Sequence, residues 1–259
     1  MKFVERLQGI GLERERVAVA LLALSFFCVL YTLLGISPPP GWRLVFLALA
    51  VCYVVAFLAV ACQWFWGRWY ASGLAWSGTM LGLASVIMLG WHPALAVYGG
   101  LHAIVLAMLA GKPLAARFEL QSGWRERFGV DEFAAARLQR YVTRASAALP
   151  SLIAWALGPR EGQESWILAS GLVLFAMVGL AGSLFMRTWG VLATAVAGVA
   201  VFSSLVLARP DFLAATWWTD PVARMGTTPG GAVFAAILLL AAVVPFAGPI
   251  ARTWRALPR

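Results

Sequence analysis

Charged residues are absent from a series of long stretches in this chain, each about 20 residues long. A helix of about that length crosses the hydrocarbon core of a bilayer. The hydrophobic class makes up 62% of the 259 residues and charged residues only 12%, against about 45–50% and about 25% in soluble domains. The sequence therefore predicts an all-α fold, a polytopic transmembrane helix bundle.

The pattern predicts eight spans, of which the fifth is the weakest. The expected spans are residues 17–36, 44–64, 70–89, 94–111, 145–157, 166–186, 189–208 and 231–250. At about 1.5 Å per residue the fifth reaches only about 20 Å, whereas the hydrocarbon core is about 30 Å thick. If residues 145–157 do not cross, the bundle has seven spans.

The net charge of +9 follows from topology. Basic residues collect in alternate loops, and seven of them lie in residues 112–144. Because positively charged loops stay in the cytoplasm, we expect the N-terminus and the C-terminus there, in a bacterial-type cytoplasmic (inner) membrane. The same argument predicts contact with the lipid bilayer and no nucleic-acid partner.

Four segments are expected. They are an amphipathic cytoplasmic segment (1–16) with its charged residues in solvent, a first four-helix transmembrane half (17–111), a cytoplasmic basic loop and helix (112–144), and a second four-helix half (145–259) with an outer loop (209–230). Asp131 is the expected N-cap of a helix that continues into the fifth span, where Pro150 would kink it. Pro245 and Pro249 are expected to bend or end the last span.

The two halves have similar lengths and four expected spans each. Residues 65–69 and 185–189 each bring Phe, Arg and Trp together at an expected cytoplasmic turn. This similarity favours a parallel internal repeat, an architecture in which transporter sites lie between the repeats. The alternative is that Arg beside Trp is common at any inner interface.

His102 and Tyr98 are the substrate or path candidates. His102 lies near the middle of the fourth span, where an ionisable residue is a functional hypothesis, and Tyr98 stands one turn earlier on the same face. The alternative is a neutral histidine that is hydrogen-bonded within the bundle. We find no nucleotide, metalloprotease or hydrolase motif, so no cofactor, metal site or catalytic residue is predicted.

Two further groups of residues are predicted to make contacts. Small residues suited to close helix packing are Gly78, Gly82, Gly99, Ala103, Ala107, Gly111, Gly190, Thr194 and Gly198. Residues expected to dock a partner or lipid are Arg137, Arg140 and Arg144 on one helix face, with Trp217 and Trp218 in the outer loop.

Three functions remain open at this point. The first is a non-enzymatic integral or accessory subunit of a membrane assembly, which would contact other subunits through the small-residue faces. The second is a permease or facilitator for an uncharged or lipid-like molecule, which requires a cavity reaching His102. The third is an intramembrane enzyme, which requires hydroxyls from other spans, such as Ser77 or Thr194, to converge on His102.

Overall fold

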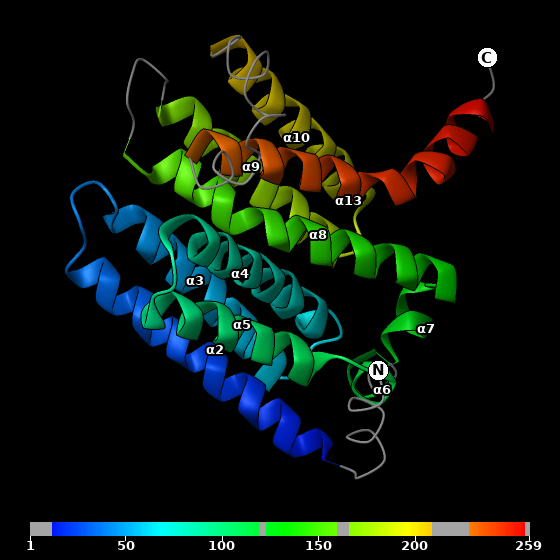
Figure 1. Cartoon of the computed structure of the whole chain (residues 1–259). Helices are drawn as coiled ribbons and strands as arrows, with labels where there is room; N and C mark the ends of the chain where they lie inside the picture. Colours follow the sequence, from blue (N-terminus) through cyan, green and yellow to red (C-terminus); the bar gives the residue numbers. More distant parts are fainter. Residues whose placement is uncertain (1–11, 120–122, 160–165, 209–227, 257–259) are drawn as a thin grey trace.

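In the computed structural model, residues 12–119, 123–159, 166–208 and 228–256 are described, and every regular element among them is a helix (Figure 1). The long helices are α2 (Glu13–Ile36), α3 (Arg43–Ala61), α4 (Gly67–Leu89), α5 (Pro93–Leu109), α8 (Glu132–Leu157), α9 (Trp166–Leu184), α10 (Thr188–Ala208) and α13 (Thr228–Ala256). Two short helices, α6 (Lys112–Glu119) and α7 (Trp124–Phe128), separate α5 from α8.

The long helices form two groups of four. In the first group α2, α3, α4 and α5 pack in a closed ring, in which each helix contacts the next and α5 returns to α2. In the second group α8, α9, α10 and α13 follow the same order, and α13 returns to α8. The two groups meet mainly where α4 packs along α8 (Figure 1).

The outer surfaces of these helices are apolar. Large side chains such as Leu22 (71% exposed), Leu174 (63%) and Leu207 (82%) project outward from α2, α9 and α10. Soluble monomers rarely expose apolar patches larger than a few hundred Å², whereas lipid tails solvate such faces. Six helices are also long and apolar enough to cross a bilayer. The protein is therefore a helical membrane protein.

The six helices that satisfy both length and hydropathy are α2, α3, α4, α9, α10 and α13. A seventh span arises if α5 and α6, which are bent by 75° at their junction, count as one broken span. Within the described residues, six helices, or seven with this pair, are therefore candidate spans by length and composition, and the expected eight depends on α5 and α8.

The length of helix α8 shows that the fifth expected span is not too short to cross the hydrocarbon core. It is one helix of 26 residues, about 39 Å at 1.5 Å per residue, and not the 13 apolar residues alone. The Asp131 side chain accepts a hydrogen bond from the N–H of Ala134 at 2.5 Å, which confirms the expected N-cap. Helix α8 packs on α4, α9 and α13, so one face of its first half is buried, at Ala135, Leu138 and Tyr141, while Glu132, Phe133 and Arg140 stay exposed.

The first helix differs from the expected boundary. Helix α2 begins at Glu13, so residues 13–16 belong to it and not to a separate surface segment, whereas residues 1–11 lie outside the described part. Arg16 was expected in solvent but is only 5% exposed, because its guanidinium donates to carbonyls at the end of α5.

Helix α13 also differs. Of the two effects expected of Pro245 and Pro249, bending or ending the helix, the second is wrong, because the helix continues to Ala256. It begins at Thr228, inside the segment expected to be an outer loop.

The α3–α4 and α9–α10 turns have the same backbone. Gln63 and Met186 both adopt positive φ, 53° and 59°. The following N–H groups, of Trp64 and Arg187, each donate to a carbonyl five residues back, at 2.9 Å in both turns, which defines the Schellman motif. The spacing is also shared, because Arg43–Ala61 moved by 123 residues gives the bounds of α9, Trp166–Leu184.

These equivalences place Trp66-Gly67 on Trp189-Gly190, a different register from the one that the sequence suggested. A Cβ on Gly67 would stand 2.6 Å from the Ala59 carbonyl carbon, and one on Gly190 would stand 2.7 Å from the Gly182 carbonyl carbon. Both turns therefore need glycine where the next helix crosses the previous one. The internal repeat stays a hypothesis, which these matching turns and helix rings support.

Candidate functional site

His102 sits in an aromatic cluster at the centre of the first helix ring. It is fully buried, and its ring centroid lies 3.8 Å from that of Phe27 and 4.5 Å from that of Tyr98. Gly78 of α4 makes room for it, because a Cβ there would overlap the imidazole. The cluster therefore joins α2, α4 and α5 around one histidine.

The hydrogen bonds of His102 fix its tautomer. Nδ1 lies 2.8 Å from the Tyr98 carbonyl oxygen, which can only accept, so Nδ1 carries the proton. Nε2 lies 2.6 Å from the Tyr53 hydroxyl, which therefore donates to it. Both ring nitrogens of a neutral imidazole are then satisfied without any ligand. Ser77 and Thr194 are not among its partners, so the convergence of hydroxyls that an intramembrane enzyme requires is not seen at His102.

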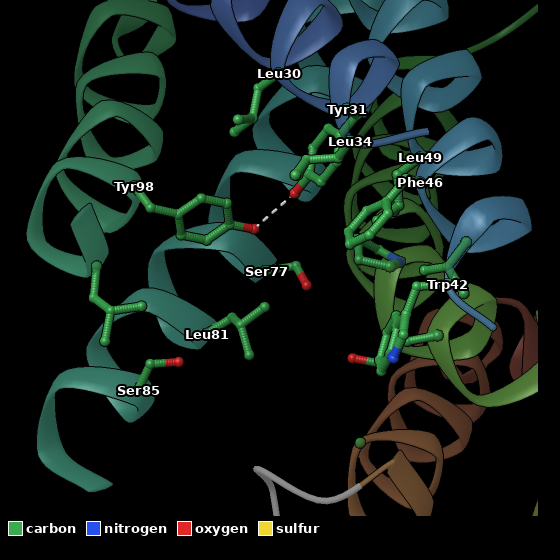
Figure 2. A pocket seen from close by; sticks show the side chains of 16 residues that line it. Leu30, Tyr31, Leu34, Trp42, Phe46, Leu49, Ser77, Leu81, Ser85 and Tyr98 are labelled. Carbon is green, nitrogen blue, oxygen red and sulfur yellow. Dashed lines mark hydrogen bonds between the residues drawn. The ribbon is translucent and has the colours of Figure 1, made fainter. Parts of the chain in front are cut away.

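A pocket of about 390 Å³ opens beside this cluster (Figure 2). We call it the far-end pocket, since its lining comes from the ends of the helices next to the α2–α3 and α4–α5 turns. The lining residues are Leu30, Tyr31, Leu34, Trp42, Val45, Phe46, Leu49, Ser77, Leu81, Ser85, Leu95, Tyr98, Pro150, Ser151, Ala154 and Gly231. None of these side chains is charged.

The structure separates the two path candidates. Tyr98 lines the far-end pocket, where its hydroxyl pairs with that of Tyr31 at 2.9 Å (Figure 2). His102 does not line it and lies one helical turn deeper, behind the Tyr98 ring. The cavity therefore ends at a layer of tyrosines and does not reach His102, contrary to what was expected for a permease. Of the two path candidates, Tyr98 is the one that a molecule in this pocket could contact. Ser77, Ser85, Tyr31 and Tyr98 supply hydroxyl groups to an otherwise apolar wall.

Several of the predicted small residues pack within the chain. A Cβ on Gly82 would stand 2.6 Å from the Cα of Gly99, so α4 and α5 touch backbone to backbone there. Gly198 packs closely on the side chains of α13. Thr194 is fully buried, and its hydroxyl lies 2.5 Å from that of Tyr141.

The stripe expected on α5 does not act as one face. Only Gly99 makes a close backbone contact with α4, whereas Ala103 and Ala107 are exposed and Gly111 lies beyond the helix with φ +104°. The outward side of this helix carries further small exposed residues, Ala96 and Gly100.

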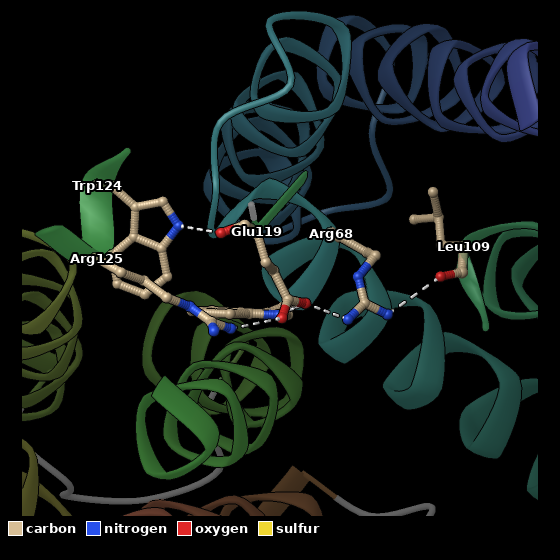
Figure 3. A network of polar contacts seen from close by, with 6 residues as sticks. Arg68, Leu109, Glu119, Trp124 and Arg125 are labelled. Atoms are coloured by element: carbon tan, nitrogen blue, oxygen red, sulfur yellow. Dashed lines mark hydrogen bonds and ion pairs between the residues drawn. The ribbon is translucent and has the colours of Figure 1, made fainter. Parts of the chain in front are cut away.

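A buried carboxylate, which the sequence did not single out, lies at the opposite end of the first ring (Figure 3). Glu119, at the end of α6, accepts hydrogen bonds from Arg68 and from the Trp69 indole, the latter at 2.7 Å. Arg125 lies 3.7 Å from its other carboxylate oxygen. The Trp124 indole donates to the Glu119 backbone carbonyl at 2.8 Å. This network ties α6 and α7 to the start of α4.

Two arginines cap the end of α5, which the bend into α6 leaves with free carbonyls. Arg16 donates to the carbonyls of Ala107, at 3.1 Å, and of Ala110. Arg68 donates to that of Leu109 at 3.4 Å. Positive charge also complements the negative end of the helix dipole. We call this end of the molecule, with Arg16 and Arg68, the basic end.

Of the predicted docking residues, Arg144 has an internal partner. Pro245 has no N–H, so the Ala241 carbonyl four residues before it loses its helical bond, and Arg144 donates to that carbonyl at 2.7 Å. Arg137 is half-buried and Arg140 is exposed. Trp217 and Trp218 lie outside the described residues.

Among the described residues, no group of three His, Cys, Asp or Glu side chains could hold a metal ion. Comparison with known protein families, with characterised proteins and with solved structures gives no significant match. The geometry of the far-end pocket and of the basic end must therefore carry the functional argument.

Proposed function

We propose that this protein binds an uncharged, lipid-like molecule in the far-end pocket and acts as a facilitator for its movement in the cytoplasmic membrane. The observation that carries the proposal is the pocket of about 390 Å³ with sixteen uncharged lining residues. Small-molecule pockets measure about 300–1,000 Å³ and are mostly apolar, with a few polar groups that fix orientation.

The chemistry of the wall selects the class of ligand. A charged group in this pocket would lose its hydration without gaining a counter-ion, at a cost of several kcal/mol. A hydroxyl or carbonyl group could instead bond to Ser77, Ser85 or the Tyr31–Tyr98 pair, while an apolar body would contact Leu81, Leu95 and the aromatic side chains. An alcohol or ester with an apolar body fits this arrangement.

The position of the pocket supports movement as well as binding. Its lining comes from α2 to α5 of the first group and from α8 and α13 of the second. Sites between two helix groups change shape when the groups rock against each other. The Tyr31–Tyr98 pair, with His102 behind it, would then be the barrier between the pocket and the basic end.

Lipid extraction tests this proposal. The protein is purified in mild detergent, and the bound lipids are identified by mass spectrometry for the native chain and two variants. Leu81→Trp enlarges a side chain that lines the pocket, whereas Leu83→Trp places the same indole outside the pocket, on the same helix and at a similar exposure (48% for Leu81 and 53% for Leu83). We expect a stoichiometric uncharged lipid on the native chain and on Leu83→Trp, and its loss from Leu81→Trp. Equal lipid on all three proteins would refute the proposal.

A second candidate function, a subunit of a membrane assembly, has its own supporting observation. Only His102, Val105 and Leu109 of α5 are buried, and its exposed face carries Ala96 and Gly100, four residues apart. Small residues at such spacing allow close contact with another membrane helix. The test is the mass of the complex in mild detergent and the proteins that co-purify with it. Gly100→Leu should release a specific partner, and a monomer without partners would exclude this function.

A further inference from the structure

A second pocket, of about 470 Å³, lies at the basic end of the second helix group, where the start of α8 faces the α9–α10 turn and Phe246 of α13. Its lining residues are Val130, Ala134, Leu138, Ser183, Met186, Arg187, Thr188, Val191, Leu192 and Phe246. We call it the basic-end pocket. Unlike the far-end pocket, it has an apolar interior with an arginine in its wall.

We propose that the basic-end pocket binds an anionic phospholipid, with an acyl chain in the cavity and the phosphate group at Arg187. Arg187 is exposed, and within the described residues its guanidinium has no acidic partner. A cation beside an apolar slot matches a molecule that joins a negative head to a hydrocarbon tail. Basic pockets between transmembrane helices on the cytoplasmic side bind such head groups.

The positive potential at this pocket has two further sources. Thr188 is the first residue of α10, a helix of 21 residues, and the N-terminus of a helix carries a partial positive charge that attracts phosphate. Arg137 stands one turn after Ala134 on α8 and is half-buried beside the pocket-lining Leu138. The acidic groups at the start of α8 are Asp131, whose carboxylate accepts the N–H of Ala134, and the exposed Glu132.

The apolar walls argue for a lipid tail and not for a free anion. Leu138, Val191, Leu192 and Phe246 line the pocket, and each would be covered by hydrocarbon. An acyl chain would cover these side chains, whereas a headgroup alone would leave them in contact with water. A free phosphate ion would gain nothing from contact with these apolar side chains.

Native mass spectrometry in detergent tests the proposal, with phosphatidylglycerol and phosphatidylcholine titrated separately. We expect the native chain to retain phosphatidylglycerol in preference to phosphatidylcholine. Arg187→Gln should lower the affinity for phosphatidylglycerol about fivefold, the factor expected for one arginine near an anionic lipid surface, and adding Arg137→Gln should lower it further. Arg43→Gln, at the exposed start of α3 at the other end of the bundle, is the matched control and should change nothing.

Two more measurements separate the sources of the phosphate and guard against misfolding. Glycerol phosphate, the headgroup without tails, should not bind at millimolar concentration, and binding as tight as that of the lipid would overturn the proposal. Ala134→Trp fills the cavity without changing charge and should also weaken phosphatidylglycerol binding, while Phe133→Trp, on a strongly exposed position, should not. Equal retention of the two lipids by the native chain would overturn the proposal as well.

Discussion

Removal of the Glu119 carboxylate should destabilise the protein more than any surface charge change. The variant Glu119→Ala leaves Arg68, whose side chain is 10% exposed, without its counter-ion, and the Trp69 indole N–H without its acceptor. Breaking a buried ion pair by removing one partner costs about 3–5 kcal/mol, and the unpaired indole contributes about 1–3 kcal/mol to such a loss. We therefore expect a decrease of about 3–5 kcal/mol in the free energy of unfolding.

The double variant Arg68→Met/Glu119→Leu distinguishes the cost of one unpaired buried charge from the cost of losing the ion pair as a whole. It removes both charges and keeps side chains of similar size, and such exchanges are often neutral or stabilising. Its unfolding free energy should lie well above that of Glu119→Ala. Glu126→Ala, which changes an exposed acid on α7, is the surface control and should stay within about 0.5 kcal/mol of the native chain.

Reversible unfolding by SDS in mixed micelles, followed by helical circular dichroism, measures these differences. If Glu119→Ala unfolds at the same SDS fraction as Glu126→Ala, the buried network does not hold α6 against α4. The reasoning from burial would then be wrong.

Three other predictions concern the second helix group and the topology. Arg144→Met should lower the free energy of unfolding by about 1.5–3 kcal/mol, as for a hydrogen bond to a charged group. The loss should be much smaller in a Pro245→Ala background, because residue 245 then has a backbone N–H that can bond to the Ala241 carbonyl. Equal losses in both backgrounds would contradict this pairing. Tyr141→Phe should cost about 0.5–1.5 kcal/mol because Thr194 loses its 2.5 Å partner, and an unchanged midpoint in the same SDS titration would contradict it. Cys62 is exposed beside the α3–α4 turn, so an impermeant maleimide should label it in inside-out vesicles and not in intact cells, whereas the opposite result would invert the expected topology.

The sequence predicted the long apolar helices well because hydropathy, together with the capping and helix-breaking residues beside each apolar run, determines where they lie. Helix α2 ends at Ile36 and α4 at Leu89, as expected, since proline and glycine follow each apolar run. The doubtful fifth span is one long helix because Asp131 supplies an N-cap far before the apolar residues begin. Local chemistry was sufficient for these features.

The buried charges could not be predicted in the same way. Arg16 and Glu119 stand beside apolar spans, where a charged residue is usually solvated at the interface. Their partners are 91 and 51 residues away in sequence, at Ala107 and Arg68. These contacts exist only because α5 ends early and the chain turns by 75° into α6. The spacing of apolar residues in the sequence does not predict this bend.

The candidate site was predicted in part. The sequence singled out Tyr98 and His102, and the structure puts Tyr98 on the pocket and His102 behind it. Tyr31 and Tyr53 gave no sequence signal, because a tyrosine in a span is usually a packing residue. The far-end pocket could not be anticipated, since six helices contribute to it and its existence depends on how their ends diverge.

An electron cryo-microscopy structure of the protein in lipid nanodiscs, prepared without delipidation, tests the central claim most directly. The account predicts elongated density in the far-end pocket, which contacts Leu81 and ends at the Tyr31–Tyr98 pair. A pocket closed by inward movement of Trp42 or Phe46, with no density between α3 and α4, would contradict it.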